Sequence, residues 1–226
     1  MPPIRVTVPP WYTALVLTYL LSQVVGSIVG GVRWRRLGLP ERFATLWLAV
    51  AALAGIGEQI LRTTHQNSQL AAHLWFAPSG VVALWIAAAI ATDRRGGRLW
   101  RAIAMGYLLV IVVLLVGAET PAEYSPYAGA IHGVVLLGVG GLSLTYRARR
   151  ARGSLWYDAG FLIAGGMMMI GGPTTFLALT SRAIGTTDRD TVRALYSMRL
   201  VMALIGQCFI LRALLPMPRR PREIAA

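Results

Sequence analysis

Seven long apolar stretches dominate this sequence and constrain its fold more than any other feature. Each has about 18 residues or more, the length that a helix needs to cross roughly 30 Å of hydrocarbon. We place them at 11–32, 43–62, 70–91, 100–117, 125–146, 155–177 and 192–215. Strands of a membrane barrel would instead show an alternating pattern over about 10 residues. The sequence therefore predicts an all-α, polytopic integral membrane protein: one seven-helix transmembrane bundle over residues 1–226, with consecutive helices as antiparallel neighbours.

Composition and charge exclude an ordinary soluble protein. Hydrophobic residues make up 56% of the chain and charged residues 14%, whereas about a quarter of the residues in a soluble domain are charged. The formal net charge of +13 arises from short clusters between the apolar stretches and does not form one basic face. We therefore expect no binding to nucleic acid.

Arginine is distributed unevenly between the two ends of the predicted helices. All 22 basic residues are arginine, and the chain has no lysine. Sixteen arginines flank the first, third and fifth linkers or the C-terminal end, five lie on the opposite side, and Arg199 lies deep within the last helix. The positive-inside rule then predicts an outside N-terminus and a cytoplasmic C-terminus. We expect a bacterial inner membrane protein whose arginine clusters contact anionic lipids at the cytoplasmic face.

The first three predicted helices resemble the last three. In each triplet an arginine-rich linker leads to a segment with an early aromatic residue, Trp47 or Trp156, which then becomes rich in glycine. This pattern resembles the three-plus-one-plus-three parallel repeat of some sugar-transporter and opsin-like architectures. The resemblance implies two related triplets with the fourth helix between them.

Glycines and a proline predict local features of the helices. Pro173 lies among glycines in the sixth helix, where it removes a backbone hydrogen bond. We therefore expect a kink there or an opened segment, and an opened segment is typical of a substrate site. The pairs Gly26/Gly30 and Gly129/Gly133 have the GxxxG spacing, which predicts close approach of helices within the bundle.

Ionisable side chains within the apolar stretches indicate function best, because charge is costly in hydrocarbon. Glu58 lies in the second stretch, His73 in the third, His132 in the fifth and Arg199 in the seventh, where Tyr196 shares its helix face. Counted inward from the predicted outer boundary at about 1.5 Å per residue, the four ionisable residues lie in the outer third of the membrane. These five residues predict an outward-facing polar pocket.

The pocket has two interpretations that need no cofactor. In one, Glu58 and Arg199 pair across the bundle and only specify packing. In the other, Arg199 binds a carboxylate or phosphate and Glu58 an amine, as in a small-molecule sensor or a transporter. In size the chain resembles the seven-helix sensor modules found ahead of bacterial kinase and cyclase domains, which implies signalling through a membrane-protein partner. We expect such a non-enzymatic role, or that of a subunit of a larger membrane complex.

The histidines allow two alternatives that use a cofactor. The spacing Ala128-x-x-x-His132 resembles that of the helices that hold bacteriochlorophyll in light-harvesting proteins. This resemblance implies a pigment or electron-transfer protein in which His73 and His132 ligate bacteriochlorophyll or haem. Glu58, His73 and His132 also form a 2-His-1-carboxylate set, which would suit an intramembrane metal-dependent hydrolase. Seven-helix hydrolases of the ceramidase and progestin-receptor type carry an HxxxH pair in the last helix, and the last helix here has no histidine.

Missing residue types exclude further chemistries. Microbial rhodopsins are N-outside seven-helix proteins that bind retinal through a lysine Schiff base, so a chain without lysine forms no such pigment. The sequence also has no GxxxxGK[ST], GxSxG or HExxH motif. We therefore expect no ATP hydrolysis by this chain.

Overall fold

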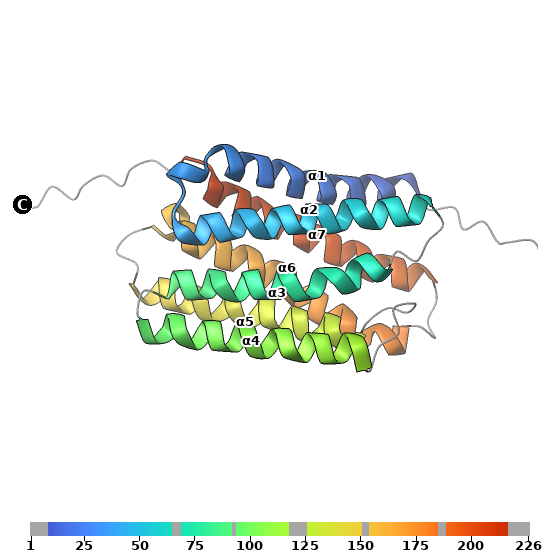
Figure 1. The fold of residues 1–226 in the computed structure, drawn as a ribbon. Helices are drawn as coiled ribbons and strands as arrows, with labels where there is room; N and C mark the ends of the chain where they lie inside the picture. The colour runs from blue at the N-terminus through green and yellow to red at the C-terminus, as the bar shows by residue number, and fades with distance from the viewer. Residues whose placement is uncertain are drawn as a thin grey trace, which may run out of the picture.

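All regular structure in the described part of the chain is helical. The computed structural model describes residues 9–64, 69–91, 94–117, 126–150, 154–184 and 189–216. Two 3-10 turns, η1 (Trp34–Arg36) and η2 (Leu155–Tyr157), accompany seven helices that run along one axis (Figure 1). These helices are α1 (Pro10–Val32), α2 (Leu39–Thr63), α3 (Gln69–Ile90), α4 (Arg94–Gly117), α5 (Pro126–Arg150), α6 (Ala159–Ile184) and α7 (Arg189–Leu214). The predicted all-α fold is confirmed.

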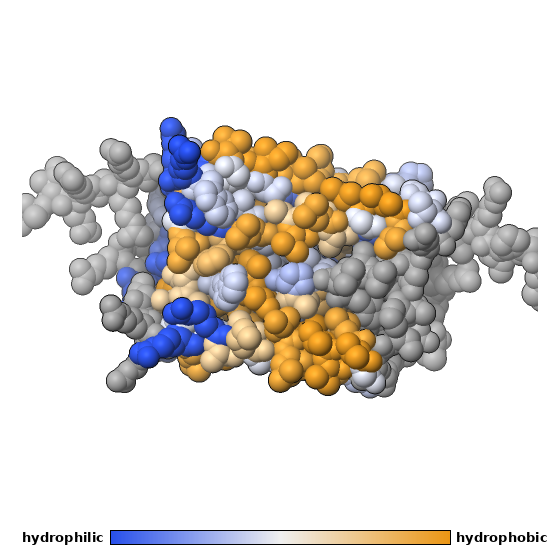
Figure 2. Space-filling model, in the orientation of Figure 1, coloured by the Kyte–Doolittle hydropathy of each residue, from blue (hydrophilic) through white to orange (hydrophobic). Residues whose placement is uncertain are grey.

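The outer surface of the bundle is that of a membrane protein. Within the described residues, six helices are long and apolar enough to cross a membrane: α1, α2, α4, α5, α6 and α7. In α3 the described side chains begin at Trp75, and Trp75–Ile90 is an apolar stretch. Apolar residues cover much of the flank of the bundle, and hydrophilic residues gather at one end (Figure 2). On α4, for example, Val116 is 83% exposed and Met105 is 69% exposed. Soluble proteins rarely expose so extensive an apolar surface, so the chain is a multi-pass helical membrane protein.

Helices that follow one another in the chain pack side by side, with one exception. Each of the pairs α1/α2, α2/α3, α3/α4, α5/α6 and α6/α7 is in extensive contact, whereas α4 and α5 scarcely meet. α5 packs on α3 instead, and α1 packs on α7. The prediction that all consecutive helices are neighbours is therefore wrong for α4 and α5. α4 packs on α3 instead, where Tyr107 of α4 fits against Gly80 and any larger residue at that position would collide with its ring.

The packing of the first three helices recurs in the last three. Within both triplets the middle helix packs on the other two, and the contact of α1 with α7 corresponds to that of α5 with α3. A 3-10 turn also separates the first two helices of each triplet, η1 in one and η2 in the other. The predicted repeat thus has a counterpart in helix packing, and α4 connects the two triplets.

Glycines bring the backbones of α5, α6 and α7 together. A Cβ added to Gly166 of α6 would lie 2.5 Å from the carbonyl oxygen of Gly206 on α7. A Cβ on Gly171 would lie 2.5 Å from the amide nitrogen of Leu137 on α5. Backbone atoms cannot move aside as a flexible side chain can, so these positions require glycine. Gly26 and Gly30 likewise face α2, which confirms the predicted approach of helices within the bundle for that pair.

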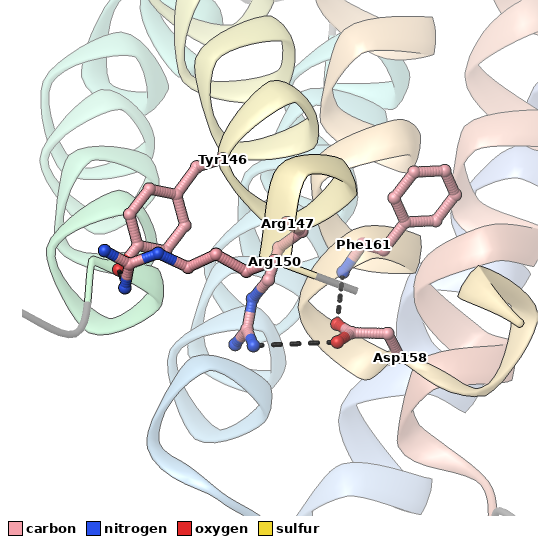
Figure 3. A network of polar contacts seen from close by, with 5 residues as sticks. All are labelled: Tyr146, Arg147, Arg150, Asp158 and Phe161. Carbon is pink, nitrogen blue, oxygen red and sulfur yellow. Dashed lines mark hydrogen bonds and ion pairs between the residues drawn. The ribbon is translucent and has the colours of Figure 1, made fainter. Parts of the chain in front are cut away.

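α6 begins later than predicted because Asp158 ends the preceding turn. The carboxylate Oδ1 of Asp158 accepts a hydrogen bond of 2.9 Å from the Phe161 amide and so caps the helix. Its Oδ2 lies 3.6 Å from Nη1 of Arg147, at the end of α5 (Figure 3). The predicted start at residue 155 is wrong, since Leu155–Tyr157 form η2 and the helix starts at Ala159.

α6 continues without interruption through Pro173. The hydroxyls of Thr174 and Thr175 each donate a hydrogen bond of 2.8 Å to a backbone carbonyl one turn earlier. Both acceptor carbonyls lie in the turn that precedes Pro173, which has no N–H of its own. The alternative of an opened segment at Pro173 is therefore wrong.

Two neighbouring glycines of α6 test the backbone packing. We predict that Gly166→Ala destabilises the protein by about 1–3 kcal/mol, because the new methyl group overpacks the contact with α7. Gly165→Ala is the matched control, since its Cβ would meet nothing closer than Phe209 Cδ1 at 3.6 Å. Thermal unfolding in detergent should show a lower midpoint for Gly166→Ala only. Equal midpoints for the two variants would contradict the packing described.

Candidate functional site

A cavity of about 240 Å³ lies between α1, α2, α3, α6 and α7. It occupies the half of the bundle remote from η1 and η2, because its lining residues come from the beginnings of α1, α3 and α7 and from the later parts of α2 and α6. Aromatic and polar side chains share its walls: Tyr12, Tyr19, Gln23, Glu58, Gln59, Trp75, Phe76, Thr174, Tyr196 and Arg199. A cavity of mixed polarity with few charged groups is the usual form of a small-molecule site.

Three of the five predicted site residues line this cavity: Glu58 on α2, and Tyr196 and Arg199 on α7. The side chain of Arg199 is anchored to α6, since its Nε donates a hydrogen bond of 3.3 Å to Thr174 Oγ1. The guanidinium has further N–H donors in the same plane, and such a planar set matches the geometry of a carboxylate or phosphate. Arg199 and Glu58 therefore bring opposite charges to the walls of one space.

Small residues on α2 make room for the cavity. Ala51, Ala54 and Gly55 line it at helical spacing i, i+3 and i+4, and Ala203 of α7 contributes a further small side chain. A Cβ on Gly55 would lie 2.8 Å from Leu20 Cδ1, so a larger residue there would close part of the space. The volume thus follows from a run of small residues whose role sequence reasoning missed.

Three polar residues of α1 were also missed as site residues. Tyr12, Tyr19 and Gln23 line the cavity, and Gln23 is only 4% exposed. Their positions, i, i+7 and i+11, place them on one face of a helix. The spacing of these polar residues within an apolar stretch could have identified them from the sequence as members of the site.

His132 lies outside the cavity lining and takes part in a buried hydrogen-bond network. Its side chain is 2% exposed, with Nδ1 3.2 Å from the Tyr107 hydroxyl and Nε2 3.3 Å from the Ser79 hydroxyl. The Tyr107 hydroxyl donates its one proton to the Phe76 carbonyl at 2.6 Å, so it accepts from Nδ1–H. Nε2 is then the acceptor for Ser79, whose oxygen accepts from the Trp47 indole at 2.8 Å.

This network joins four helices through His132 of α5. Trp47 comes from α2, Ser79 and Phe76 from α3, and Tyr107 from α4. Phe76 also lines the cavity, and its ring centroid is 5.4 Å from that of His132, which therefore lies behind the aromatic wall. Because both imidazole nitrogens are engaged, iron could bind His132 only by displacing one of these hydrogen bonds.

The remaining histidine-based predictions reach beyond the described side chains. His73 belongs to α3, but its side chain lies outside the described residues. The Glu58, His73 and His132 metal set therefore stays a prediction. Among the described residues, no three His, Cys, Asp or Glu side chains form a group that could hold a metal ion.

Comparison with known proteins assigns the chain to no family. No family model matches the sequence, and neither a curated protein nor a solved structure matches it. The interpretation of the cavity therefore rests on its geometry and chemistry.

The tyrosine of the His132 network offers a direct test. We predict that Tyr107→Phe destabilises the protein by about 1–3 kcal/mol, because the Phe76 carbonyl and His132 Nδ1 both lose a buried partner. Thermal unfolding in detergent should show a midpoint lower by about 2–4 °C per kcal/mol. Tyr157→Phe is the control, since Tyr157 is 46% exposed. A Tyr107→Phe midpoint as high as that of Tyr157→Phe would contradict the assigned network.

Proposed function

We propose that the protein is a seven-span membrane sensor that binds a small zwitterionic molecule from the outer side of a bacterial inner membrane. In this proposal α3 is the seventh span, the N-terminus is outside and the C-terminus is cytoplasmic. The arginine-rich end carries η1, η2 and the ends of α3 and α7, and it faces the cytoplasm. The cavity then opens toward the outer side, and a membrane-protein partner receives the signal.

The observation that carries the proposal is the presence of Arg199 and Glu58 on one cavity. Arginine binds a carboxylate through two parallel hydrogen bonds, and a glutamate binds an ammonium group. Trp75, Phe76 and Tyr19 provide apolar and aromatic surface for the body of the ligand. An α-amino acid with an aromatic side chain has both charged groups and such a body, so it is the ligand class that suits these walls best.

The packing below the cavity favours sensing over transport. Toward the arginine-rich end, Trp47, Leu48, Met167 and Ile210 are all at most 1% exposed and fill the centre of the bundle. Gly26 of α1 also packs directly on Leu48. A ligand in the cavity would contact α1, α2, α3, α6 and α7 together, so its binding can change how these helices pack without passing through them.

Three related compounds test the proposed charge recognition. We predict that L-phenylalanine raises the thermal midpoint of the purified protein in detergent in a saturable manner. 2-Phenylethylamine lacks the carboxylate and 3-phenylpropanoate lacks the amine, so each should bind about tenfold more weakly or worse. Equal midpoint shifts with all three compounds, or none with phenylalanine, would contradict zwitterion binding.

Two variants identify the groups that recognise each charge. Arg199→Gln should remove the preference for phenylalanine over 2-phenylethylamine, and Glu58→Gln should remove the preference over 3-phenylpropanoate. Arg212→Gln is the matched control, because Arg212 is on α7 but outside the cavity lining. In proteoliposomes, uptake of radiolabelled phenylalanine above that of protein-free vesicles would contradict a sensor and favour a transporter.

A further inference from the structure

A second cavity lies at the opposite, arginine-rich end of the bundle. Its volume is about 480 Å³. Residues of the linker between α1 and α2, of the linker between α5 and α6 and of the last turn of α7 surround it. Three arginines contribute to its walls: Arg33, Arg36 and Arg147. The cavity therefore lies where the corresponding linkers of the two triplets meet.

Two buried N–H groups of these arginines have no hydrogen-bond partner in the described structure. They are Nη1 of Arg33 and Nε of Arg147. An unpartnered donor on a charged group is costly when it is removed from water, so an acceptor that reached these atoms would stabilise this end of the bundle. Gly160 at the start of α6 allows this position of Arg147, since a Cβ there would lie 2.7 Å from the arginine Nε.

The two acidic residues of the cavity are engaged by helix N-termini. Asp158 caps α6 through Oδ1 and pairs with Arg147 through Oδ2 (Figure 3). Glu41 lies in the first turn of α2, and its carboxylate is folded back toward Gly38. An acid in a first helical turn is stabilised by the helix dipole. The cavity therefore has three arginines and only two carboxylates, and both carboxylates already interact with a helix N-terminus. Hydrogen-bond donors of the arginines are thus available to an anion.

By contrast, the guanidinium of Arg150, at the same end of the bundle, has its partners within the chain. Its guanidinium lies 4.3 Å from the ring centroid of Tyr146 and donates a hydrogen bond to the Tyr146 hydroxyl (Figure 3). Arg147, one turn earlier, points instead toward α6 and the cavity. The two side chains of one helix end thus have different surroundings, and only Arg147 lines the cavity.

We propose that this cavity binds a phosphate group through Arg33, Arg36 and Arg147. Arginine suits phosphate because its planar donors form paired, charge-assisted hydrogen bonds. The volume exceeds that of a phosphate ion, so the site accommodates a phosphate ester with its substituent. Tyr157 lines the cavity, and the neighbouring Trp156 is 62% exposed. Such aromatic residues are typical of the lipid headgroup level, where the phosphate comes from either a lipid headgroup or a soluble molecule.

Thermal unfolding with two probes tests the site and distinguishes the sources. Purified protein in uncharged detergent is titrated with inorganic phosphate at constant ionic strength, and separately with phosphatidylglycerol against phosphatidylcholine in mixed micelles. A saturable rise of the midpoint with inorganic phosphate assigns a soluble phosphate ligand. A rise with phosphatidylglycerol alone assigns a lipid headgroup. No saturable rise with any probe overturns the proposal.

Charge-matched variants separate a built site from general attraction to a basic surface. Arg33→Gln and Arg147→Gln should each weaken the effective probe about tenfold or more. Arg35→Gln and Arg149→Gln remove the same charge from exposed positions outside the cavity and should leave binding within about twofold of wild type. Arg33→Gln is the main variant, because Arg147→Gln also breaks the pair with Asp158. Equal losses for Arg33→Gln and Arg35→Gln would overturn the proposal.

Discussion

In hydrocarbon a polar side chain must find its partner within the protein, and this requirement organises the bundle. The hydrogen bonds of His132 reach Ser79 and Tyr107, and through them Trp47 and the Phe76 carbonyl, so one imidazole connects four helices. Arg199 of α7 is tied to Thr174 of α6. Each of these hydrogen bonds forms only when its helices have a particular rotation about their own axes. The hydrogen bonding of the buried polar groups and the arrangement of the helices therefore depend on each other.

The size of the side chains then decides where helices touch and where space remains. Glycines let α6 approach α5 and α7 at backbone distance, which leaves no room between them near Gly166 and Gly171. On α2 the small residues Ala51, Ala54 and Gly55 have the opposite effect, because they line a cavity whose other walls include the bulky side chains of Tyr19 and Trp75. The same small residue types thus produce both the tight packing of α6 and the cavity beside α2.

Most of the fold could be predicted from the sequence, because apolar length and glycine spacing are local properties. All seven helices were expected, and the approach of α1 to α2 at Gly26 and Gly30 follows directly from their spacing. The separation of α4 from α5 was not predictable, since linker length does not determine which helix α4 packs on, and the fit of Tyr107 against Gly80 of α3 is a three-dimensional property. Nor was the start of α6, which depends on a cap and an ion pair at Asp158.

The sequence indicated part of the candidate site for the same reason. Rare charges in apolar stretches identified Glu58 and Arg199, which line one cavity. The place of His132 behind the aromatic wall depends on helix rotation, which residue depth alone does not determine. The unpartnered nitrogens of Arg33 and Arg147 are likewise a three-dimensional property that counting arginines between helices cannot reveal.

The central claim is that Arg199 and Glu58 bind the two charged ends of one ligand. Solid-state NMR dipolar recoupling on isotope-labelled L-phenylalanine and protein measures this orientation directly. We expect the ligand carboxylate within about 4 Å of the Arg199 guanidinium nitrogens and the ligand amine within about 4 Å of the Glu58 carboxylate oxygens. Bound phenylalanine with neither contact, or with its two ends reversed, would contradict this claim.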